Sequence, residues 1–407
     1  MKKALTQNRD IVIVGQQPWD TEIGSNCKNI AVEMSRNNRV LYVNSPLDTK
    51  SVLLRQDDPK IKTRLDIVRG KKEGLERISD NLWSFYPDIT VYSINWLSYA
   101  PLFDYLNKLN NRKFSRSITQ IMRQLDFKDI ILFNDGDIFK SFYLKELLKP
   151  QASVYYSRDY YLAGGYWKKH GSRLEPQLIG KNNICVANSV FLTDYCRKYN
   201  ENSYYVGQGC ELDLFKRDAS FDMPPDIKHL KKPLIGYAGA LESSRLDLEI
   251  IESIALSKPE WNIVLAGPED NTFKTSRLHS ISNIHFIGRK KPEELPAYIN
   301  AFDVCINPQS INELTIGNYP RKIDEYLAMG KPVIAAHTRA MEIFKGFAYL
   351  SKNKGDYISL IEQALEENNE KLEAERENFA RSHTWENSVN EIYKAIEAYE
   401  NKAFHTI

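Results

Sequence analysis

The order strand, loop, helix, strand near the start of the chain restricts it to folds built on parallel sheets. The apolar run at residues 11–14 ends at Gly15, a helical pattern around Ile30 follows, and residues 39–43 form the next apolar run. Parallel strands need a crossover connection, which is usually a helix, so this order predicts a βαβ unit. The class expected is therefore α/β.

The same order recurs along the chain. In the first half we expect further strands at residues 130–133, 153–156 and 184–187. In the second half we expect strands at residues 234–238, 261–266, 284–287, 303–306 and 332–336, with helices at 244–256, 292–301 and 320–329. The final helical stripe spans residues 385–401 and has one apolar face that must pack against another element.

A chain of 407 residues exceeds what one hydrophobic core usually serves, so two domains are expected. Residues 216–232 are polar, rich in proline and without periodicity, which is typical of a linker. The sequence thus predicts two Rossmann-like, doubly wound domains at residues 1–215 and 233–384. The helix from residue 385 to 407 is expected to pack back toward the first domain.

The composition is that of a globular protein with a core, at 42% hydrophobic and 27% charged residues. No apolar run is long enough to span a bilayer, and the N-terminus lacks the apolar segment of a signal peptide. The cysteines are odd in number, scattered and without a C-x-x-C pair, so we expect reduced thiols. A cytoplasmic location follows as an expectation, with a further option of peripheral attachment to the inner face of the membrane.

Positive charge is concentrated in the first half. Residues 1–231 contain 35 Lys and Arg against 27 Asp and Glu, whereas residues 232–407 contain 20 against 26. A basic, aromatic stretch from Trp96 to Arg123 could meet anionic lipid headgroups or a phosphate-bearing acceptor, although ordinary solvated helix faces explain it equally well. No nucleic-acid partner is expected, since no binding module accompanies the charge.

The helix expected at residues 320–329 carries a cation and a carboxylate on one face. Pro320 suits the first helical position and Gly330 suits a left-handed residue after the last. Lys322 and Glu325 are three residues apart, so they project together. A cation near a helix N-terminus suits a diphosphate, and a carboxylate one turn later suits a sugar diol. The alternative is an ordinary surface ion pair.

Four loops that follow expected strands supply further candidates. In open α/β sheets ligands bind at the carboxyl ends of strands. The first loop contains Gly239, where backbone comes close to a ligand, and Arg245, a fork for phosphate. The others are residues 266–269, the turn with Gly288 and Arg289, and residues 307–320, which include Glu313.

Taken in order, these segments resemble the glycosyltransferases of the GT-B fold, family 4-like, of bacterial surface polysaccharide synthesis. The resemblance is carried by Gly-Tyr-Ala-Gly, Leu-Ala-Gly-Pro, Asn-Ile-His-Phe-Ile-Gly-Arg, Phe-Asp-Val-Cys-Ile-Asn-Pro and Lys-x-x-Glu-Tyr-Leu-Ala-x-Gly-Lys-Pro-Val, all between residues 234 and 336. The resemblance implies two domains that face a cleft, with the acceptor on the side of the first domain.

The resemblance also implies roles for individual residues. Glu325 would hold the ribose hydroxyls, Arg245 and Lys322 the diphosphate, and the backbone around Gly288 and Arg289 the base. Many members of the family have a second glutamate eight residues before the helix glutamate. That position here is Gly317, and Glu313 is the nearest upstream acid, so the contact to the donor sugar is open.

The expected reaction is transfer from a nucleotide-diphosphate sugar, of UDP or GDP type, to a saccharide or lipid-linked saccharide. The resemblance implies retention of configuration, and no cofactor or metal is expected, since Arg245 and Lys322 can stabilise the leaving diphosphate. Asp159 and His170 are candidates to face the acceptor or the donor sugar. Their alternatives are a turn carboxylate and a surface histidine.

Other interpretations compete. Asp135-Gly-Asp137 resembles the Asp-x-Asp metal motif of the other major glycosyltransferase fold, although a turn is favoured. A nucleotide-sugar 2-epimerase, or a non-catalytic subunit that binds nucleotide sugars, would use the same fold.

Overall fold

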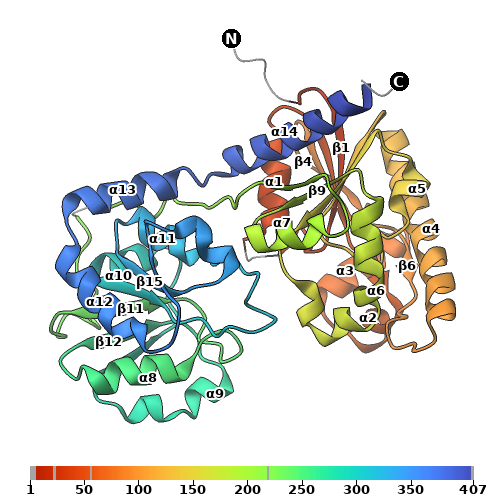
Figure 1. The fold of residues 1–407 in the computed structure, drawn as a ribbon. Helices are drawn as coiled ribbons and strands as arrows, with labels where there is room; N and C mark the ends of the chain where they lie inside the picture. Colours follow the sequence, from red (N-terminus) through yellow and green to blue (C-terminus); the bar gives the residue numbers. More distant parts are fainter. Residues whose placement is uncertain (1–5, 22–23, 56, 218–219, 405–407) are drawn as a thin grey trace. The chain divides into compact units, whose positions relative to one another are not determined.

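The computed structural model describes residues 6–21, 24–55, 57–217 and 220–404, which form two compact units (Figure 1). Unit 1 comprises Met1–Gly207 and Trp385–Ile407, and unit 2 comprises Gln208–Thr384. The chain passes between the units twice. Each unit has its own parallel sheet, which confirms the α/β class with two Rossmann-like domains.

Unit 1 is built on a sheet whose eight described strands have the order β10-β9-β8-β7-β1-β2-β5-β4. Neighbouring strands pair in parallel except β4 and β5. A separate parallel pair is formed by β3 and β6. The strands are β1 (Asp10–Gly15), β2 (Arg39–Asn44), β3 (Leu47–Asp48), β4 (Leu75–Ser79), β5 (Leu82–Phe85), β6 (Thr90–Val91), β7 (Ile131–Asn134), β8 (Ala152–Ser157), β9 (Ile184–Ala187) and β10 (Ser203–Tyr205).

The helices of unit 1 begin at capping side chains where the sequence supplies them. Ser25, Asp48, Asp58 and Ser189 each accept a hydrogen bond from a backbone N–H of the first turn that follows. The helices are α1 (Asn26–Met34), α2 (Thr49–Leu54), α3 (Pro59–Val68), α4 (Ala100–Gln124), α5 (Leu144–Leu148), the 3₁₀ turn η1 (Tyr161–Ala163), α6 (Gly165–Lys181), α7 (Val190–Arg197) and α14 (Trp385–Phe404).

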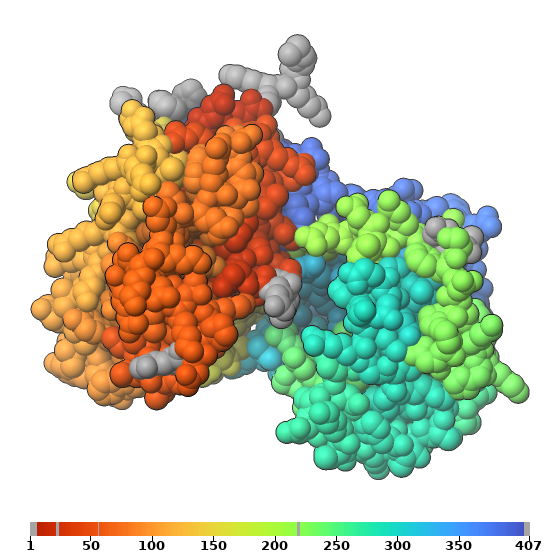
Figure 2. Space-filling view, turned by 180° about the vertical axis from the view of Figure 1, so that it is seen from behind, coloured from red at the N-terminus to blue at the C-terminus, as the bar shows by residue number. Residues whose placement is uncertain are grey.

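Both faces of this sheet are covered. Ile11 and Ile13 lie in one buried cluster and Val12 and Val14 in another, because alternate residues of a strand point to opposite faces. This is why the strands read as continuous apolar runs. Much of one surface of the unit is formed by segments from the first third of the chain, in red and orange (Figure 2).

Helix α14 belongs to unit 1. Its apolar stripe, which includes Val389, Ile392 and Ile396, packs with Ile30 of α1 in one cluster. Asn38 donates a hydrogen bond of 2.8 Å to the hydroxyl of Tyr393. The last helix is thus part of the core of the first unit. Within the described residues, no helix of either unit is both long enough and apolar enough to cross a membrane.

Unit 2 has a sheet, wholly parallel among its described strands, in the order β13-β12-β11-β14-β15-β16. Numbered within the unit this is 3-2-1-4-5-6, the dinucleotide-binding order, with the switch point between β11 and β14. The strands are β11 (Leu234–Ala238), β12 (Asn262–Ala266), β13 (Ile284–Gly288), β14 (Val304–Asn307), β15 (Val333–Ala336) and β16 (Tyr349–Ser351). The helices are α8 (Leu248–Ser257), α9 (Asn271–Lys274), η2 (Arg277–Ser280), α10 (Leu295–Ala301), α11 (Lys322–Ala328), η3 (Arg339–Phe344), α12 (Asp356–Glu367) and α13 (Glu370–Arg381).

Helices α8, α10 and α11 of unit 2 each begin later than the sequence pattern predicts. Helix α8 begins after Asp247, whose side chain accepts from the backbone N–H of Glu249 and so caps the helix, whereas the pattern places its start at residue 244. Helix α11 begins at Lys322 instead of Pro320, because the chain enters it through i to i−3 hydrogen bonds, including Ile323 N to Pro320 O at 2.9 Å. It therefore has about two turns, whereas three were expected.

The segment expected as a linker, residues 216–232, is part of unit 2. Ile227 is fully buried in a cluster with Leu234, Phe302 and Tyr326. The first passage between units lies earlier, at Gly207–Gln208. Low periodicity was misleading here, since an irregular segment can still supply single buried side chains.

Candidate functional site

The candidate site of unit 2 begins where β11 ends, at the switch point of the sheet. Gly239 has a φ of +144°, a conformation that L side chains rarely adopt. A Cβ on Gly267 would lie 1.8 Å from the carbonyl oxygen of Gly239. Both loops need glycine, because the ends of β11 and β12 bring their backbones into direct contact.

Helix α11 is attached to this same strand end by a tyrosine. The hydroxyl of Tyr326 accepts from the backbone N–H of Ala238 at 2.7 Å and donates to its carbonyl at 3.1 Å. Arg376, which is buried, donates to the carbonyl of Gly330 at 3.2 Å after the helix ends. Gly330 has a φ of +72°, as the sequence predicts for this position. The C-terminal part of the helix is thus held by two contacts.

This attachment places Lys322 beside the Gly239 loop. A Cβ built on Gly239 would lie 2.7 Å from the ammonium nitrogen of Lys322. The ammonium donates a hydrogen bond to the hydroxyl of Tyr237 and lies 4.0 Å from the centre of its ring. Burial lowers the pKa of Lys322 to about 8, while Glu325 opposes the shift and Arg245 adds to it. The side chain is a cation at neutral pH, with a loosely held proton.

Glu325 lies one turn further along the helix and is half-buried. Burial raises the pKa of its carboxyl, and the charges of Arg321 and Lys322 oppose that rise. Within the described part of the chain, its carboxylate accepts no hydrogen bond from another side chain or from backbone. A half-buried carboxylate of this kind is available to accept hydrogen bonds from a ligand.

Arg245 comes from the loop after β11 and is linked to the loop after β14. Its guanidinium pairs with Glu242 at 3.2 Å, and 44% of its side chain is exposed. Its carbonyl accepts from Ser310 N at 2.9 Å, and Asn312 donates to the carbonyl of Ser244 at 3.0 Å. The structure therefore brings Arg245 and Lys322 into one electrostatic neighbourhood at the switch point.

The remaining candidates of unit 2 are less closely placed. Gly288, with a φ of +69°, and Arg289 are exposed at the end of β13, which is an edge strand. Glu313 is exposed in the loop after β14, whereas Thr315 and Gly317 of that loop are buried.

A buried cluster beneath the site is not evident from the sequence. Asp324 lies between Lys322 and Glu325 in the sequence and is fully buried. Its carboxylate accepts a hydrogen bond from Tyr319 OH at 2.8 Å and lies 2.6 Å from His383 Nδ1. The thiol of Cys210 lies 3.2 Å from the same carboxylate. These partners fix the rotation of α11, and they are far apart in sequence. A signal did exist for Tyr326, since a tyrosine on a buried face needs a partner for its hydroxyl.

In unit 1, Asp159 belongs to an ion-pair cluster. Arg158 donates to Asp135 at 2.8 Å and to Asp159 at 2.9 Å. Burial raises the pKa of Asp135, and Arg158 opposes the shift. Asp159 is 45% exposed, so one side of it faces solvent.

His170 has the environment of a packed core residue, which is neither the ligand-facing position nor the surface position considered from sequence. It is 4% exposed and stacks on Phe103 at 3.8 Å. Its Nε2 lies 2.8 Å from the carbonyl of Leu97, so Nε2 must donate. Burial lowers its pKa, which keeps the ring neutral.

The Asp135-Gly-Asp137 segment forms a turn after β7. The Asp137 carboxylate accepts from the backbone N–H groups of Phe139 and Lys140. The side-chain amide of Asn134 accepts from the backbone N–H of Asp137 and donates to its carbonyl. Across the described residues, no three acidic, histidine or cysteine side chains are grouped as a metal site. The five cysteines are buried and unpaired.

The fold and this switch-point site define a class that comparisons with known structures identify. Sucrose-phosphate synthase from Thermosynechococcus elongatus superposes with a TM-score of 0.66 at 12% identity, over 98% of this chain and all of that one. Anabaena HepE, in complex with UDP and glucose, gives 0.60 at 14% identity, over 96% of this chain and all of that one. The chain has the GT-B fold.

Sequence comparisons find similarity to glycosyltransferases over part of the chain. Residues 232–367, about a third of the chain, match the model of the family Glycosyl transferases group 1. A protein of Bacillus subtilis named as a teichuronic acid biosynthesis glycosyltransferase is 27% identical over 201 residues, 48% of this chain and 50% of its own. A phosphatidyl-myo-inositol mannosyltransferase of Propionibacterium freudenreichii is 23% identical over 177 residues, 42% of this chain and 43% of its own. The chain spans about half the length of these curated relatives.

The depressed pKa of Lys322 predicts a pH dependence of stability. Its pKa is about 8 when folded and 10.5 when unperturbed, so between these values the unfolded state binds more protons. The free energy of unfolding should therefore rise with pH across this window through Lys322. We expect the free energy of unfolding of the wild type to rise relative to that of Lys322→Met between pH 7.5 and pH 10. Urea unfolding measures this, through the transition that reports on unit 2. A difference between the two proteins that does not change with pH would contradict this.

Proposed function

We propose that the protein is a glycosyltransferase that moves a sugar from a nucleotide-diphosphate sugar to a saccharide or lipid-linked saccharide in cell-surface polysaccharide synthesis. The observation that carries the proposal is the placement of Lys322 against Gly239, with Glu325 one turn away. The family match of residues 232–367 supports it, as do the name of the Bacillus subtilis relative and the UDP bound to Anabaena HepE.

The two cations account for how the diphosphate is held. In the transfer the bond between the anomeric carbon and the diphosphate oxygen breaks, a hydroxyl oxygen of the acceptor forms the new bond to that carbon and loses its proton, and negative charge grows on the diphosphate. Lys322 and Arg245 stabilise that charge, and the backbone at Gly239 lets the phosphates approach. Because α11 has only seven residues, the charges of these side chains matter more than the helix dipole. We infer that the reaction needs no metal and, from the family resemblance, that it retains configuration.

The carboxylate of Glu325 accounts for recognition of the ribose. A carboxylate can accept two O–H hydrogen bonds, which matches a vicinal diol. Gly288 and Arg289 at the end of β13 are proposed to meet the base, and Glu313 the donor sugar. In unit 1, Asp159 is proposed to face the acceptor, because its carboxylate is half-exposed next to Arg158.

Glu325→Ala is expected to weaken binding of UDP or GDP by more than tenfold, about 1.4 kcal/mol or more, because the ribose hydroxyls lose their acceptor. Calorimetry measures this, with Glu366→Ala as a control for loss of an exposed glutamate of the same unit. Removing the 2′-hydroxyl of the nucleotide should weaken binding to the wild type and change little in the variant. Unchanged affinity in Glu325→Ala would contradict the assignment.

Incubation with a panel of UDP-sugars and GDP-sugars tests the reaction itself. We expect slow hydrolysis of one donor to nucleoside diphosphate and free sugar, equal with and without EDTA, and lost in Lys322→Met because the leaving charge is no longer stabilised. The anomeric proton of the released sugar, read by NMR before mutarotation, reports retention. An isomerised sugar would indicate an epimerase, binding without turnover a non-catalytic subunit, and EDTA sensitivity a metal site.

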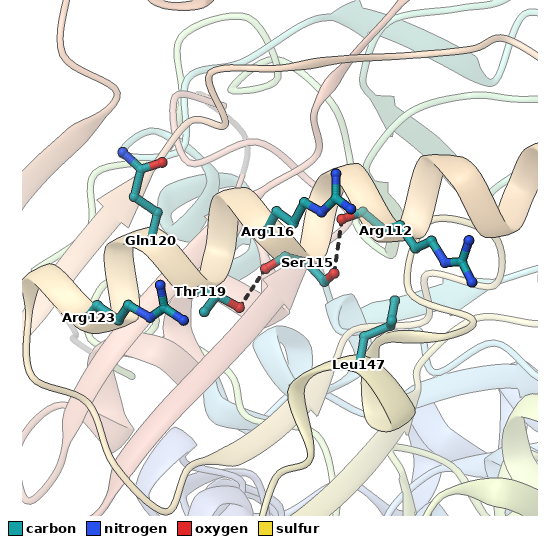
Figure 3. A pocket seen from close by; sticks show the side chains of 7 residues that line it. All are labelled: Arg112, Ser115, Arg116, Thr119, Gln120, Arg123 and Leu147. Atoms are coloured by element: carbon teal, nitrogen blue, oxygen red, sulfur yellow. Dashed lines mark hydrogen bonds between the residues drawn. The ribbon is translucent and has the colours of Figure 1, made fainter.

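A row of arginines on α4 supports the second proposal, peripheral contact of unit 1 with an anionic membrane. Arg112, Arg116 and Arg123 line one groove of about 730 Å³ together with Ser115, Thr119, Gln120 and Leu147 (Figure 3). All three arginines are exposed, and within the described residues none of them forms an ion pair. Their spacings of four and seven residues place them on one face of the helix.

Anionic vesicles test this surface. Each basic residue near a charged membrane contributes about 1 kcal/mol, so the triple change of Arg112, Arg116 and Arg123 to Gln should strongly reduce co-sedimentation with phosphatidylglycerol vesicles. Replacing Lys231, Lys352 and Lys371 of unit 2 by Gln removes the same charge and should have little effect. Equal loss in both variants, or equal binding to neutral vesicles, would contradict a specific surface.

A further inference from the structure

Unit 1 contains a second cavity, distinct from the arginine groove, at the carboxyl ends of its strands. Its volume is about 640 Å³, within the usual range for small-molecule pockets. Its lining includes Gln16 after β1, Ser45 after β2 and Asp137 after β7. The strand order of the unit 1 sheet reverses between β1 and β7. We call this cavity the aromatic pocket.

Much of the pocket wall is aromatic. Trp167 stacks on Phe139 at 5.5 Å, with ring planes 17° apart. Trp96 and Tyr166 are 74% and 59% exposed, although rings of this size are usually covered. The indole N–H of Trp96 donates to the carbonyl of Ser93 at 2.9 Å, which leaves the ring as an apolar plate. The wall therefore offers flat apolar surfaces to a ligand.

Two acceptor atoms in this wall have no hydrogen-bond partner among the residues that the structure describes. Asp137 is 4% exposed, and its Oδ1 accepts from two backbone N–H groups, whereas its Oδ2 is buried and without a hydrogen bond. Asn95 donates through its Nδ2 to the carbonyl of Tyr166 at 2.8 Å, whereas its Oδ1 is likewise unsatisfied. An unpaired buried acceptor is costly, so a ligand O–H group that reaches either oxygen would be favoured.

The charges of the pocket cancel. Asp48 and Asp137 are matched by Lys50 and Lys140, all of which line the cavity. Asp48 accepts hydrogen bonds from Ser51 and Ser93, and Lys140 donates to Ser45 at 3.1 Å. This balance differs from the row of arginines on α4. It disfavours a diphosphate or a phosphorylated sugar and favours a neutral molecule with many hydroxyl groups.

We propose that the aromatic pocket binds an uncharged saccharide, with hydroxyl groups on Asp137 and Asn95 and a ring face on Trp96. An uncharged sugar ring offers hydroxyl donors, which match the oxygens of Asp137 and Asn95, and an apolar C–H face, which matches the ring of Trp96. As the class of acceptor, the assignment rests on the proposed transferase function. As a binding site, it stands on the pocket alone.

Saturation-transfer NMR on the full chain tests the proposal with methyl hexopyranosides and disaccharides, against glucose 6-phosphate and a short alkyl alcohol. We expect signal from the C–H protons of at least one neutral saccharide. Trp96→Ala should abolish it, and Asp137→Asn, which keeps an acceptor for the turn, should lower affinity at least tenfold. Tyr105→Ala, an exposed aromatic change on α4 outside the pocket, should have no effect.

Binding of UDP or GDP, measured on the same proteins, separates the two proposals. Saccharide binding without nucleotide binding would sink the transferase and leave the pocket standing. Nucleotide binding with no neutral saccharide bound would overturn the pocket proposal alone. Stronger binding of glucose 6-phosphate or of the alcohol, or equal saccharide binding by Trp96→Ala, would also overturn it.

Discussion

The donor-site account depends on the double hydrogen bond between the Tyr326 hydroxyl and the backbone of Ala238. This one hydroxyl satisfies a donor and an acceptor at the end of a central strand, where the ladder stops. It also fixes the distance between that strand and α11. Because Lys322 lies one turn before Tyr326 on the same helix, this fixed distance places its ammonium beside the Gly239 loop. A phenylalanine here would keep the packing and lose the alignment.

Half-burial of charge gives the site its capacity to bind. Burial deprives Lys322 of water enough to lower its pKa to about 8, and within the described part of the chain its ammonium donates a hydrogen bond to Tyr237 alone. Glu325 is deprived of water as well, and burial raises its pKa. Each group would be stabilised by a ligand that offers it an opposite charge or a hydrogen-bond partner, because the protein does not fully compensate the cost of burying either charge. The fully satisfied Asp324 between them shows the contrast: it is buried, bonded and structural.

The sequence predicts the sheets and the main site residues because both depend on local pattern. Apolar runs that end in glycine mark β1 and β11, and the spacing of Lys322 and Glu325 marks one helix face. What depends on contacts distant in sequence was not predictable. His170 packs on Phe103 sixty-seven positions earlier, and the partners of Asp324 come from both ends of unit 2. The start of α11 was missed because Pro320 precedes a turn of i to i−3 bonds.

The two units present different chemistry to ligands. Unit 2 offers cations and a carboxylate at a switch point, which fit a nucleoside diphosphate, and unit 1 offers aromatic plates with balanced charge, which fit a neutral sugar. A crystal structure of the protein with a bound nucleoside diphosphate tests the central claim most directly. The account predicts the diphosphate at Lys322 and the Gly239 loop, with the ribose hydroxyls on Glu325. A nucleotide bound elsewhere, or with its ribose away from Glu325, would contradict it.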